Sequence, residues 1–287
     1  MAGPVVRFHL PSPPLRPYIS SYYFTEVTEA PTGDLLTPEW ANLRFVLSGR
    51  WTVRFVRSGA VADRGSALFG PTSQAVEVRC EAPGATLGVG LLPLGWTQLL
   101  SAPAHAFADR CARLEAGAMG DFAALEAAIA RASSDEDRVA AVDAHFRSRL
   151  VRQPTPTPLL LRAHESLMDP ATRTARDFAA GLGVSERHAV RLAQDMFGFA
   201  PKLLLRRQRF LRTLAVISAD PKTVWGDRLD DGYFDQSHFV RDFKWFMGCT
   251  PTTYFERPRP IISAAARARQ AMLGAGYQGL HPPQAAG

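Results

Sequence analysis

The fold is decided by the stretch DQSHFVRDFKWFMGCTP, which runs from Asp235 to Pro251. When this stretch is moved back by 50 residues, it falls on SERHAVRLAQDMFGFAP, which runs from Ser185 to Pro201. The two copies carry His, Val, Arg, Gly and Pro at matching positions, and each opens on a residue that caps helices well. Catalytic residues rarely come in duplicated helices, so the repeat indicates a structural unit that is used twice.

The first copy is predicted to belong to a helix-turn-helix unit. Residues 175–182 have helical periodicity, and residues 183–184 form the short Gly-containing turn that joins the two helices of such a unit. Ser185 is expected to cap the second helix, which ends at Gly198.

The second copy has the same layout. The segment TVWGDRLDD (223–231) is the expected first helix, and residues 232–234 form the turn. The second helix carries an apolar stripe at i, i+4 and i+7 that we expect to face the core, formed by Phe239, Phe243 and Phe246.

The segment between the two copies is predicted to be a single helix that opens at Pro201 and reaches about Ser218. At 1.5 Å per residue such a helix is roughly 27 Å long. Successive major-groove faces on one side of DNA repeat every ~34 Å. A stiff helix of this length can therefore hold two reading helices in adjacent grooves of one duplex.

Positive charge is concentrated in the same part of the chain. The formal net charge is +6, yet residues 1–150 hold 14 Lys and Arg against 15 Asp and Glu. Residues 171–260 hold 15 Lys and Arg against 10 Asp and Glu, which gives this segment +5. A basic excess confined to one segment favours a polyanionic partner there, although a solvated charged face is the simpler alternative.

The region from about Thr172 to Arg257 resembles the double helix-turn-helix DNA-binding domain of the AraC/XylS transcription-factor family. The motifs that carry the resemblance are SERHAVR…GFAPKLLLRRQRF in the first unit and GYFDQSHFVRDFKWFMGCTP in the second. The resemblance implies that two recognition helices occupy consecutive major grooves of double-stranded DNA.

By matching position, the resemblance also implies which side chains meet DNA. Base contacts would come from Arg187, Val190 and Arg191 in the first unit and from Gln236, Ser237, His238 and Arg241 in the second. His188 shares the repeat position of His238, and phosphate contact or helix packing is the alternative role for both. Phosphates or solvent would be met by Lys244, Arg206, Arg207, Arg209 and Arg212.

The N-terminal half reads as β-rich. Strands are expected at NLRFVL (42–47), WTVRFV (51–56), AVEVRC (75–80) and TLGVGLL (86–92), with a hairpin at residues 48–50 between the first two. Helices are expected over residues 95–101, 121–132 and 136–150, followed by the Pro-rich linker VRQPTPTP.

These segments define the domain organisation that the sequence predicts. A β-rich sensory or dimerisation domain covers residues 1–150, a linker 151–158, the DNA-binding domain 159–260 and a flexible tail 261–287. The stretch FGPTSQAVEVRC…LGVGLLPLGWTQLLSAP resembles the sensory domain of a large AraC-type subgroup, which implies a small β-barrel-like, cupin-like module with helices. The expected fold class is therefore α+β, a barrel-like domain followed by an all-α domain.

Motifs of common enzyme and metal sites are missing from the sequence. The seven His residues show no HxH or HExxH spacing, and GxSxG, a Walker loop and a GxGxxG before a helix are absent. We therefore expect no metal, no cofactor and no catalysis. Trp51 and Arg54, or Glu39 and Trp40, could line a pocket of the β domain, but core packing is the simpler role.

Cysteine content and the chain start bear on location. Three widely spaced cysteines without CxxC fit a reducing cytosol, and MAGPVVRFHLPSPPL lacks the pattern of a signal peptide. No apolar run approaches ~18 residues, so we expect no membrane span. The expected protein is a cytoplasmic, sequence-specific regulator, in the family usually an activator that contacts RNA polymerase.

Three further points stay open from sequence. A small-molecule effector or a homodimer formed through the N-terminal domain are both compatible with the resemblance. One alternative is a DNA-targeted small-molecule-binding or cysteine alkyl-transfer protein, as some relatives fuse a reactive Cys module to such a domain. Another is an orphan regulator that has no ligand.

Overall fold

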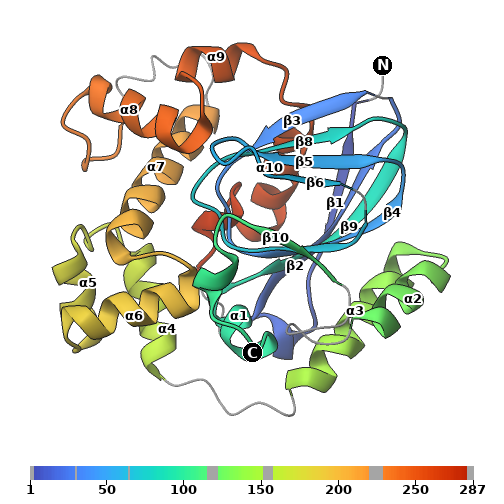
Figure 1. The fold of residues 1–287 in the computed structure, drawn as a ribbon, viewed down its shortest axis with the longest axis horizontal. Helices are drawn as coiled ribbons and strands as arrows, with labels where there is room; N and C mark the ends of the chain where they lie inside the picture. Colours follow the sequence, from blue (N-terminus) through green and yellow to red (C-terminus); the bar gives the residue numbers. More distant parts are fainter. Residues whose placement is uncertain are drawn as a thin grey trace.

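The computed structural model describes residues 3–29, 31–63, 65–114, 122–150, 158–219 and 229–282, and Figure 1 shows its fold. The N-terminal half is built on two antiparallel sheets. The first sheet has the order β1 (Val5–His9), β2 (Ile19–Val27), β9 (Gly84–Leu91), β4 (Asn42–Ser48), β7 (Ala67–Phe69) and β10 (Cys111–Arg113). The second has the order β3 (Thr32–Leu36), β8 (Val76–Cys80), β5 (Trp51–Phe55) and β6 (Val61–Asp63).

The two sheets pack face to face around a common apolar layer. Val27 of the first sheet, for example, lies in one buried cluster with Trp51 and Val78 of the second. Each sheet keeps its own edge strands, and no ladder joins the sheets within the described ranges. The domain is therefore barrel-like but open. The expected α+β class is confirmed, with two packed sheets in place of a closed barrel.

The four strands expected from the alternating pattern are confirmed as β4, β5, β8 and β9, but the other six were not predicted and the hairpin expected at residues 48–50 is wrong. β4 pairs with β7 and β9, whereas β5 pairs with β6 and β8. Gly49 has φ +81°, and a Cβ there would lie 2.6 Å from the Cα of Gly84. The turn thus crosses a tight corner from one sheet to the other, and a local turn signal cannot say which partner a strand finds.

Three helices and two 3₁₀ turns accompany the sheets. They are α1 (Pro93–Leu99), α2 (Ala123–Arg131), α3 (Asp135–Leu150), η1 (Pro13–Leu15) and η2 (Ala104–Phe107). The apolar face predicted for α3 is confirmed, because Val142 and Phe146 are fully buried and Val139 and Leu150 pack beside them. Residues 151–157 of the expected linker lie outside the described ranges.

The described residues from Pro158 onward are mostly helical, which was expected as far as residue 260. The helices are α4 (Pro158–Met168), α5 (Ala175–Leu182), α6 (Glu186–Phe197), α7 (Pro201–Ala219), α8 (Gln236–Met247), α9 (Pro251–Glu256) and α10 (Pro260–Leu273), followed by the 3₁₀ turn η4 (Gln278–Leu280). None of the helices in the described ranges is both long and apolar enough to cross a membrane.

The expectation of a frayed tail is wrong for residues 261–282. α10 packs against β1 and β3, and Ile261 and Ile262 are buried. The carboxylate of Asp34 in β3 accepts a hydrogen bond from the N–H of Ile262 at 2.8 Å, at the start of this helix. Alanine is the best helix former, so an Ala-rich composition that suggested disorder instead supports a helix once one side of it is buried.

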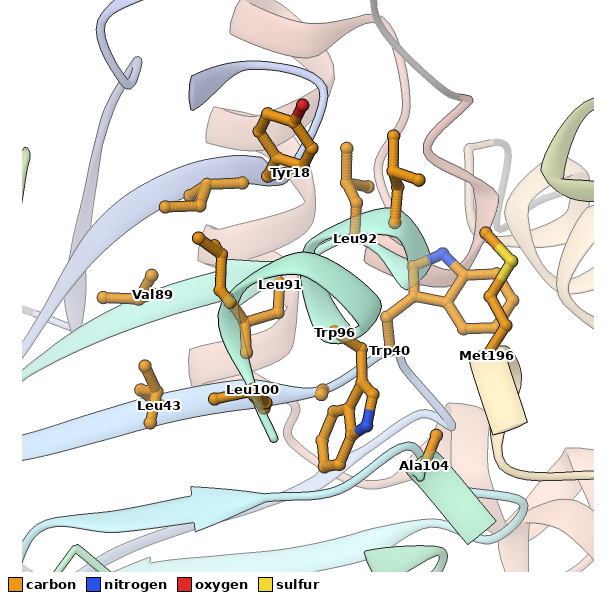
Figure 2. Close-up of a cluster of buried hydrophobic side chains, with 14 of the residues drawn as sticks. Tyr18, Trp40, Leu43, Val89, Leu91, Leu92, Trp96, Leu100, Ala104 and Met196 are labelled. Carbon is orange, nitrogen blue, oxygen red and sulfur yellow. The ribbon is translucent and has the colours of Figure 1, made fainter. Parts of the chain in front are cut away.

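The β domain and the helical half share their hydrophobic core. One buried cluster runs from Leu43 and Leu91 of the first sheet through Trp40 to Met196 and Phe197 of α6. Figure 2 shows Met196 beside Trp40, with Trp96 of α1 below them. The two halves are therefore fixed to each other by packing and not only by a covalent linker.

Candidate nucleic-acid interface

The first helix-turn-helix unit is defined by its caps. Thr174 and Asp177 form a reciprocal capping box at the start of α5, and Gly183 ends that helix with φ +68°. The hydroxyl of Ser185 then accepts a hydrogen bond from the N–H of His188 at 3.3 Å, which starts α6. Gly198 ends α6 with φ +85°. The left-handed conformation at both helix ends is one that glycine adopts without steric cost.

The second unit repeats this geometry. The carboxylate of Asp235 accepts a hydrogen bond from the N–H of His238 at 2.7 Å, and Gly248 ends α8 with φ +72°. α6 and α8 are both 12 residues long. The helix expected before the second turn falls largely on residues 220–228, which lie outside the described ranges.

Four buried positions of the two helices coincide under the same shift of 50 residues, and Asp242 is buried in α8 alone. The four positions of this shared face hold Ala189, Ala193, Met196 and Phe197 in α6 and Phe239, Phe243, Phe246 and Met247 in α8. The predicted phenylalanine stripe is therefore confirmed as core. Since the same face of each helix is buried, the opposite face of each is left to solvent.

The residues that the sequence assigned to DNA contact lie on that opposite face. Arg187, Arg191, Gln236, Ser237, Arg241 and Lys244 are exposed, and His188, Val190 and His238 are half-buried. An exposed helix face with Arg and Gln in its first turns matches what the major groove can read, because Arg pairs with guanine and Gln with adenine. Their contact with bases remains a prediction.

His238 is held by its neighbours. Its Nε2 lies 3.3 Å from the Nη2 of Arg209, and its ring packs edge-on against Tyr233 and stacks on Phe234. Phe234 is 96% exposed, so the side chain beside His238 projects from the turn into solvent. These contacts favour helix positioning by His238, with its ring still at the surface.

α7 is joined to α8 by a buried carboxylate. Asp242 is almost fully buried and accepts hydrogen bonds from Arg206 Nε at 2.6 Å and from Arg209 Nη2 at 3.1 Å. The hydroxyl of Tyr233 donates to the same carboxylate at 3.0 Å. A charge buried with several hydrogen-bond partners fixes geometry, so this cluster sets how α8 sits on α7.

The assignment of Arg207 to phosphate or solvent is wrong. Its side chain is fully buried, its guanidinium carbon lies 3.9 Å from the centre of the Trp40 ring, and its Nη1 donates to the carbonyl of Thr72 at 2.9 Å. Burial lowers the pKa of Arg207 to about 9. The helical pattern of α7 cannot reveal that this face meets the β domain, because the contact is distant in sequence.

A basic cleft of about 910 Å³ lies between the two units. Among the described residues, six cations line it, against three carboxylates. The cations are Arg173, Lys202, Arg206, Arg209, Arg212 and Arg241, and the carboxylates are Asp230, Asp231 and Asp242. Arg173 and Lys202 were missed from the sequence. Both are exposed and stand beside helix starts at Thr174 and Pro201, which is a signal that could have found them.

The β domain contacts the C-terminal ends of both candidate reading helices. At the end of α6, His105 Nδ1 lies 3.3 Å from a carboxylate oxygen of Asp195, and a Cβ on Gly198 would lie 2.6 Å from Pro71. At the end of α8, the N–H of Ala75 donates to the carbonyl of Phe246 at 2.6 Å.

Trp245 adds a second contact at α8. The guanidinium carbons of Arg57 in the β domain and Arg206 in α7 lie 3.8 Å and 4.7 Å from its ring centre. Pro71 lies at the end of α6 and Ala75 at the end of α8. Residues 71–75 of the β domain therefore reach the C-terminal end of each repeated helix.

The pocket residues suggested by the sequence separate into two groups. Glu39 and Trp51 line a cavity of the β domain, whereas Trp40 is buried against Arg207, and Arg54 is exposed and pairs with Glu77. The three cysteines are free, and burial raises the pKa of the thiols of Cys80, Cys111 and Cys249.

Comparison with known families agrees with this geometry. A family model described as a helix-turn-helix domain matches residues 178–257, and one described as a domain of unknown function (DUF6597) matches residues 7–113. No curated protein sequence matches the chain.

Several solved structures are similar at low sequence identity. ToxT from Vibrio cholerae has a TM-score of 0.47 at 9% identity, covering 88% of this chain and 98% of that one. ToxT from Vibrio cholerae O395 bound to (E)-4-(8-methylnaphthalen-1-yl)but-3-enoic acid has a TM-score of 0.46 at 10% identity, with the same coverage. The AraC-like transcriptional activator CuxR has a TM-score of 0.30 at 14% identity, covering 68% of this chain and 77% of that one.

Proposed function

We propose that this chain is a DNA-binding regulator of the AraC type, whose helix-turn-helix domain reads two adjacent major grooves of one duplex. α6 enters the first groove and α8 the second. The observation that carries the proposal is the repeat in three dimensions. Two helices of equal length are capped alike, buried on the same face and joined by the 19-residue helix α7.

Base reading comes from the exposed face of each helix. In the first groove Arg187 and Arg191 are the cationic readers, with Val190 for apolar contact and His188 beside them. In the second groove Gln236, Ser237 and Arg241 play this role, with His238 at the turn and Lys244 toward the backbone.

The basic cleft supplies contacts to the phosphates between the two grooves. Arg173 and Lys202 are exposed at its rim, on the first-unit side. Contacts to phosphate carry no sequence information but position the protein on the duplex. Each neutralised phosphate releases counterions, so the affinity should fall steeply with salt.

Regulation comes through the β domain. Because residues 71–75 touch the ends of both reading helices, a change in this domain alters how the two helices are placed relative to each other. An effector in the β domain, or a homodimer formed through it, would act by this route, and a promoter-bound protein would act as an activator by contacting RNA polymerase.

The rival functions have less support. An alkyl-transfer protein needs a nucleophilic thiolate, and burial raises the pKa of all three thiols, which disfavours that form near neutral pH. A regulator without any ligand differs only in its β domain, and it would show no rise in unfolding midpoint in a ligand screen.

Footprinting on genomic DNA, followed by salt titration on a selected site, tests the proposal. We expect protection of two consecutive major grooves on one face of the duplex. Raising the salt from about 50 to 200 mM should weaken binding by about 10³-fold or more if six or more phosphates are contacted. A single protected groove, or affinity that hardly changes with salt, would contradict it.

A further inference from the structure

The turn before α8 presents one apolar ring almost entirely to solvent. Phe234 is 96% exposed, whereas the other exposed large apolar side chains of the described residues, Val5, Leu10 and Val216, reach 45% at most. A single apolar side chain at the surface is common and needs no explanation by itself. Its place in the fold therefore decides whether the exposure of Phe234 has a role.

The repeat breaks at this position. Under the shift of 50 residues Phe234 falls on Val184, and each of them directly precedes the residue that caps the reading helix. Val184 is only partly exposed and packs against the core. Phe234 lacks that packing, although an apolar residue at this place ordinarily packs on the fourth residue of the helix.

Tyr233 packs there instead. Its side chain is buried, and its ring centre lies 5.4 Å from that of Phe239, the fourth residue of α8. The hydroxyl of Tyr233 also donates to the carboxylate of Asp242 at 3.0 Å. Since Tyr233 closes the start of α8, the ring of Phe234 is not needed to hold the turn.

The ring of Phe234 lies beside the reading helix. It is nearly parallel to the ring of His238, with 19° between the planes and 6.2 Å between the centres. His238 Nε2 lies 3.3 Å from Arg209 Nη2, and Phe234 lines the basic cleft together with Arg173 and Arg241. An apolar ring thus stands among cations at the end of α8 that a helix-turn-helix points at base edges.

Thymine is the base whose edge suits this ring. In the major groove thymine alone presents a methyl group, and phenylalanine makes apolar contact with it. An apolar wedge that unstacks bases enters from the minor groove, whereas the first turn of α8 suits the major groove. Covering one methyl group is worth about fourfold in affinity.

We propose that Phe234 is a specificity-determining residue of the second reading unit, and that its ring contacts the 5-methyl group of a thymine beside the bases read by Gln236 and Arg241. The inference rests on the proposed reading of two grooves. It adds a preference for thymine at one position of the second subsite.

Replacing thymine by deoxyuridine tests the contact, because this change removes the methyl group and keeps the hydrogen-bonding groups of the base. Each thymine in either strand of the second subsite is replaced in turn, and binding of the full-length protein is titrated. For the unmodified protein we expect one replacement to weaken binding about fourfold. Phe234→Ala should bind the thymine site about fourfold more weakly and should bind the thymine and deoxyuridine sites equally, as a double-mutant cycle requires of a direct contact.

Two further variants serve as controls. Phe234→Leu keeps an apolar side chain and should retain part of the deoxyuridine penalty. Val5→Ala changes an exposed apolar residue of β1 in the β domain and should retain the full penalty. Because Phe234 is exposed, Phe234→Ala should keep the circular dichroism spectrum of the unmodified protein and its affinity for random DNA.

The same deoxyuridine penalty in Phe234→Ala, no penalty at any thymine, or a second subsite that selects no thymine would each overturn the proposal while leaving the two-groove reading intact. Unchanged binding of Phe234→Ala to the selected site would also overturn it, and would leave the ring to a protein partner. Failure to select any site, or protection of a single groove, would remove the proposed function and this inference together.

Discussion

At single residues, the surroundings of each arginine determine what its charge does. Arg241 is exposed on α8 and free to meet a base, whereas Arg207 is buried against Trp40 and joins the two halves of the protein. Arg206 and Arg209 lie between these extremes, since both pair with the buried carboxylate of Asp242. The same residue type therefore orients a helix in one place, fixes a domain interface in another, and at Arg241 is proposed to read DNA.

Arg241→Ala should weaken binding to the selected site by about 1–3 kcal/mol and relax selectivity at one base. The reason is the loss of a side chain that can pair with a base edge in the second groove. Titrations on the selected site, on single-base variants and on random DNA measure the effect. Arg267→Ala removes an equal charge from an exposed position of α10 and should change little. Equal loss on random DNA would assign Arg241 to a phosphate.

Two buried histidines should make stability fall with acidification. Burial is the main cause that lowers the pKa of His164 to about 3 and that of His281 to about 4, from 6.5. Between pH 6.5 and 4 the unfolded chain binds protons that the folded chain does not. The unfolding free energy should therefore drop by about 1.4 kcal/mol per pH unit for each histidine in that window.

Urea denaturation between pH 6 and 5 checks this slope. In His164→Leu, one titrating group is gone, so the slope should fall by about 1.4 kcal/mol per pH unit relative to the unmodified protein. The difference between the two proteins cancels the contribution of the carboxylates. An unchanged slope would show that His164 is protonated in the folded state.

At the scale of elements, the ends of α6 and α8 could be predicted because capping is local. Ser185 and Asp235 accept from the N–H three residues on, and Gly198 and Gly248 end the helices, all within a few residues of sequence. The partners of β5 could not be predicted. β4 is its neighbour in the chain, but β5 pairs with β6 and β8 instead, and this choice depends on how the two sheets pack.

Glycine substitutions should separate backbone strain from packing at the helix ends. Gly183 and Gly198 both have positive φ, but a Cβ on Gly183 meets nothing within 4 Å, whereas one on Gly198 meets Pro71 at 2.6 Å. Gly183→Ala should cost about 1–2 kcal/mol in unfolding free energy from strain alone. Gly198→Ala should cost about 1–3 kcal/mol more, because it also overpacks the contact with the β domain.

Urea denaturation measures both variants, and DNA titration gives a second readout. Gly198→Ala should also alter DNA affinity through the position of α6 relative to the β domain. Equal costs for the two substitutions would mean that the contact between Gly198 and Pro71 adjusts freely, which would contradict the packing account.

At the scale of the whole molecule, the sequence predicted a β-rich domain and a helical DNA-binding domain, but it could not show that the two share one hydrophobic core. The clusters that join Trp40 to Met196 and Ala75 to Phe246 connect residues far apart in the chain. The tail expectation is wrong for the same reason, because Ile262 bonds to Asp34 and Arg269 packs on Phe8, both in the first 45 residues. Sequence periodicity shows that a face is apolar, not what covers it.

A shared core should make the protein unfold as one unit. Urea unfolding followed by tryptophan fluorescence and by far-ultraviolet circular dichroism should give coincident transitions, because separating the halves exposes the cluster around Trp40. Two resolved transitions would show that the halves are stable independently and that the interface contributes little.

The central claim is that α7 holds two reading helices rigidly, one for each of two adjacent grooves. Inserting 5 base pairs between the two subsites of the selected DNA tests it most directly, because ~10.5 base pairs make one turn and the insertion moves one subsite to the opposite face. The account predicts that affinity falls to that of a single subsite. Affinity equal to that of the uninterrupted site would contradict it.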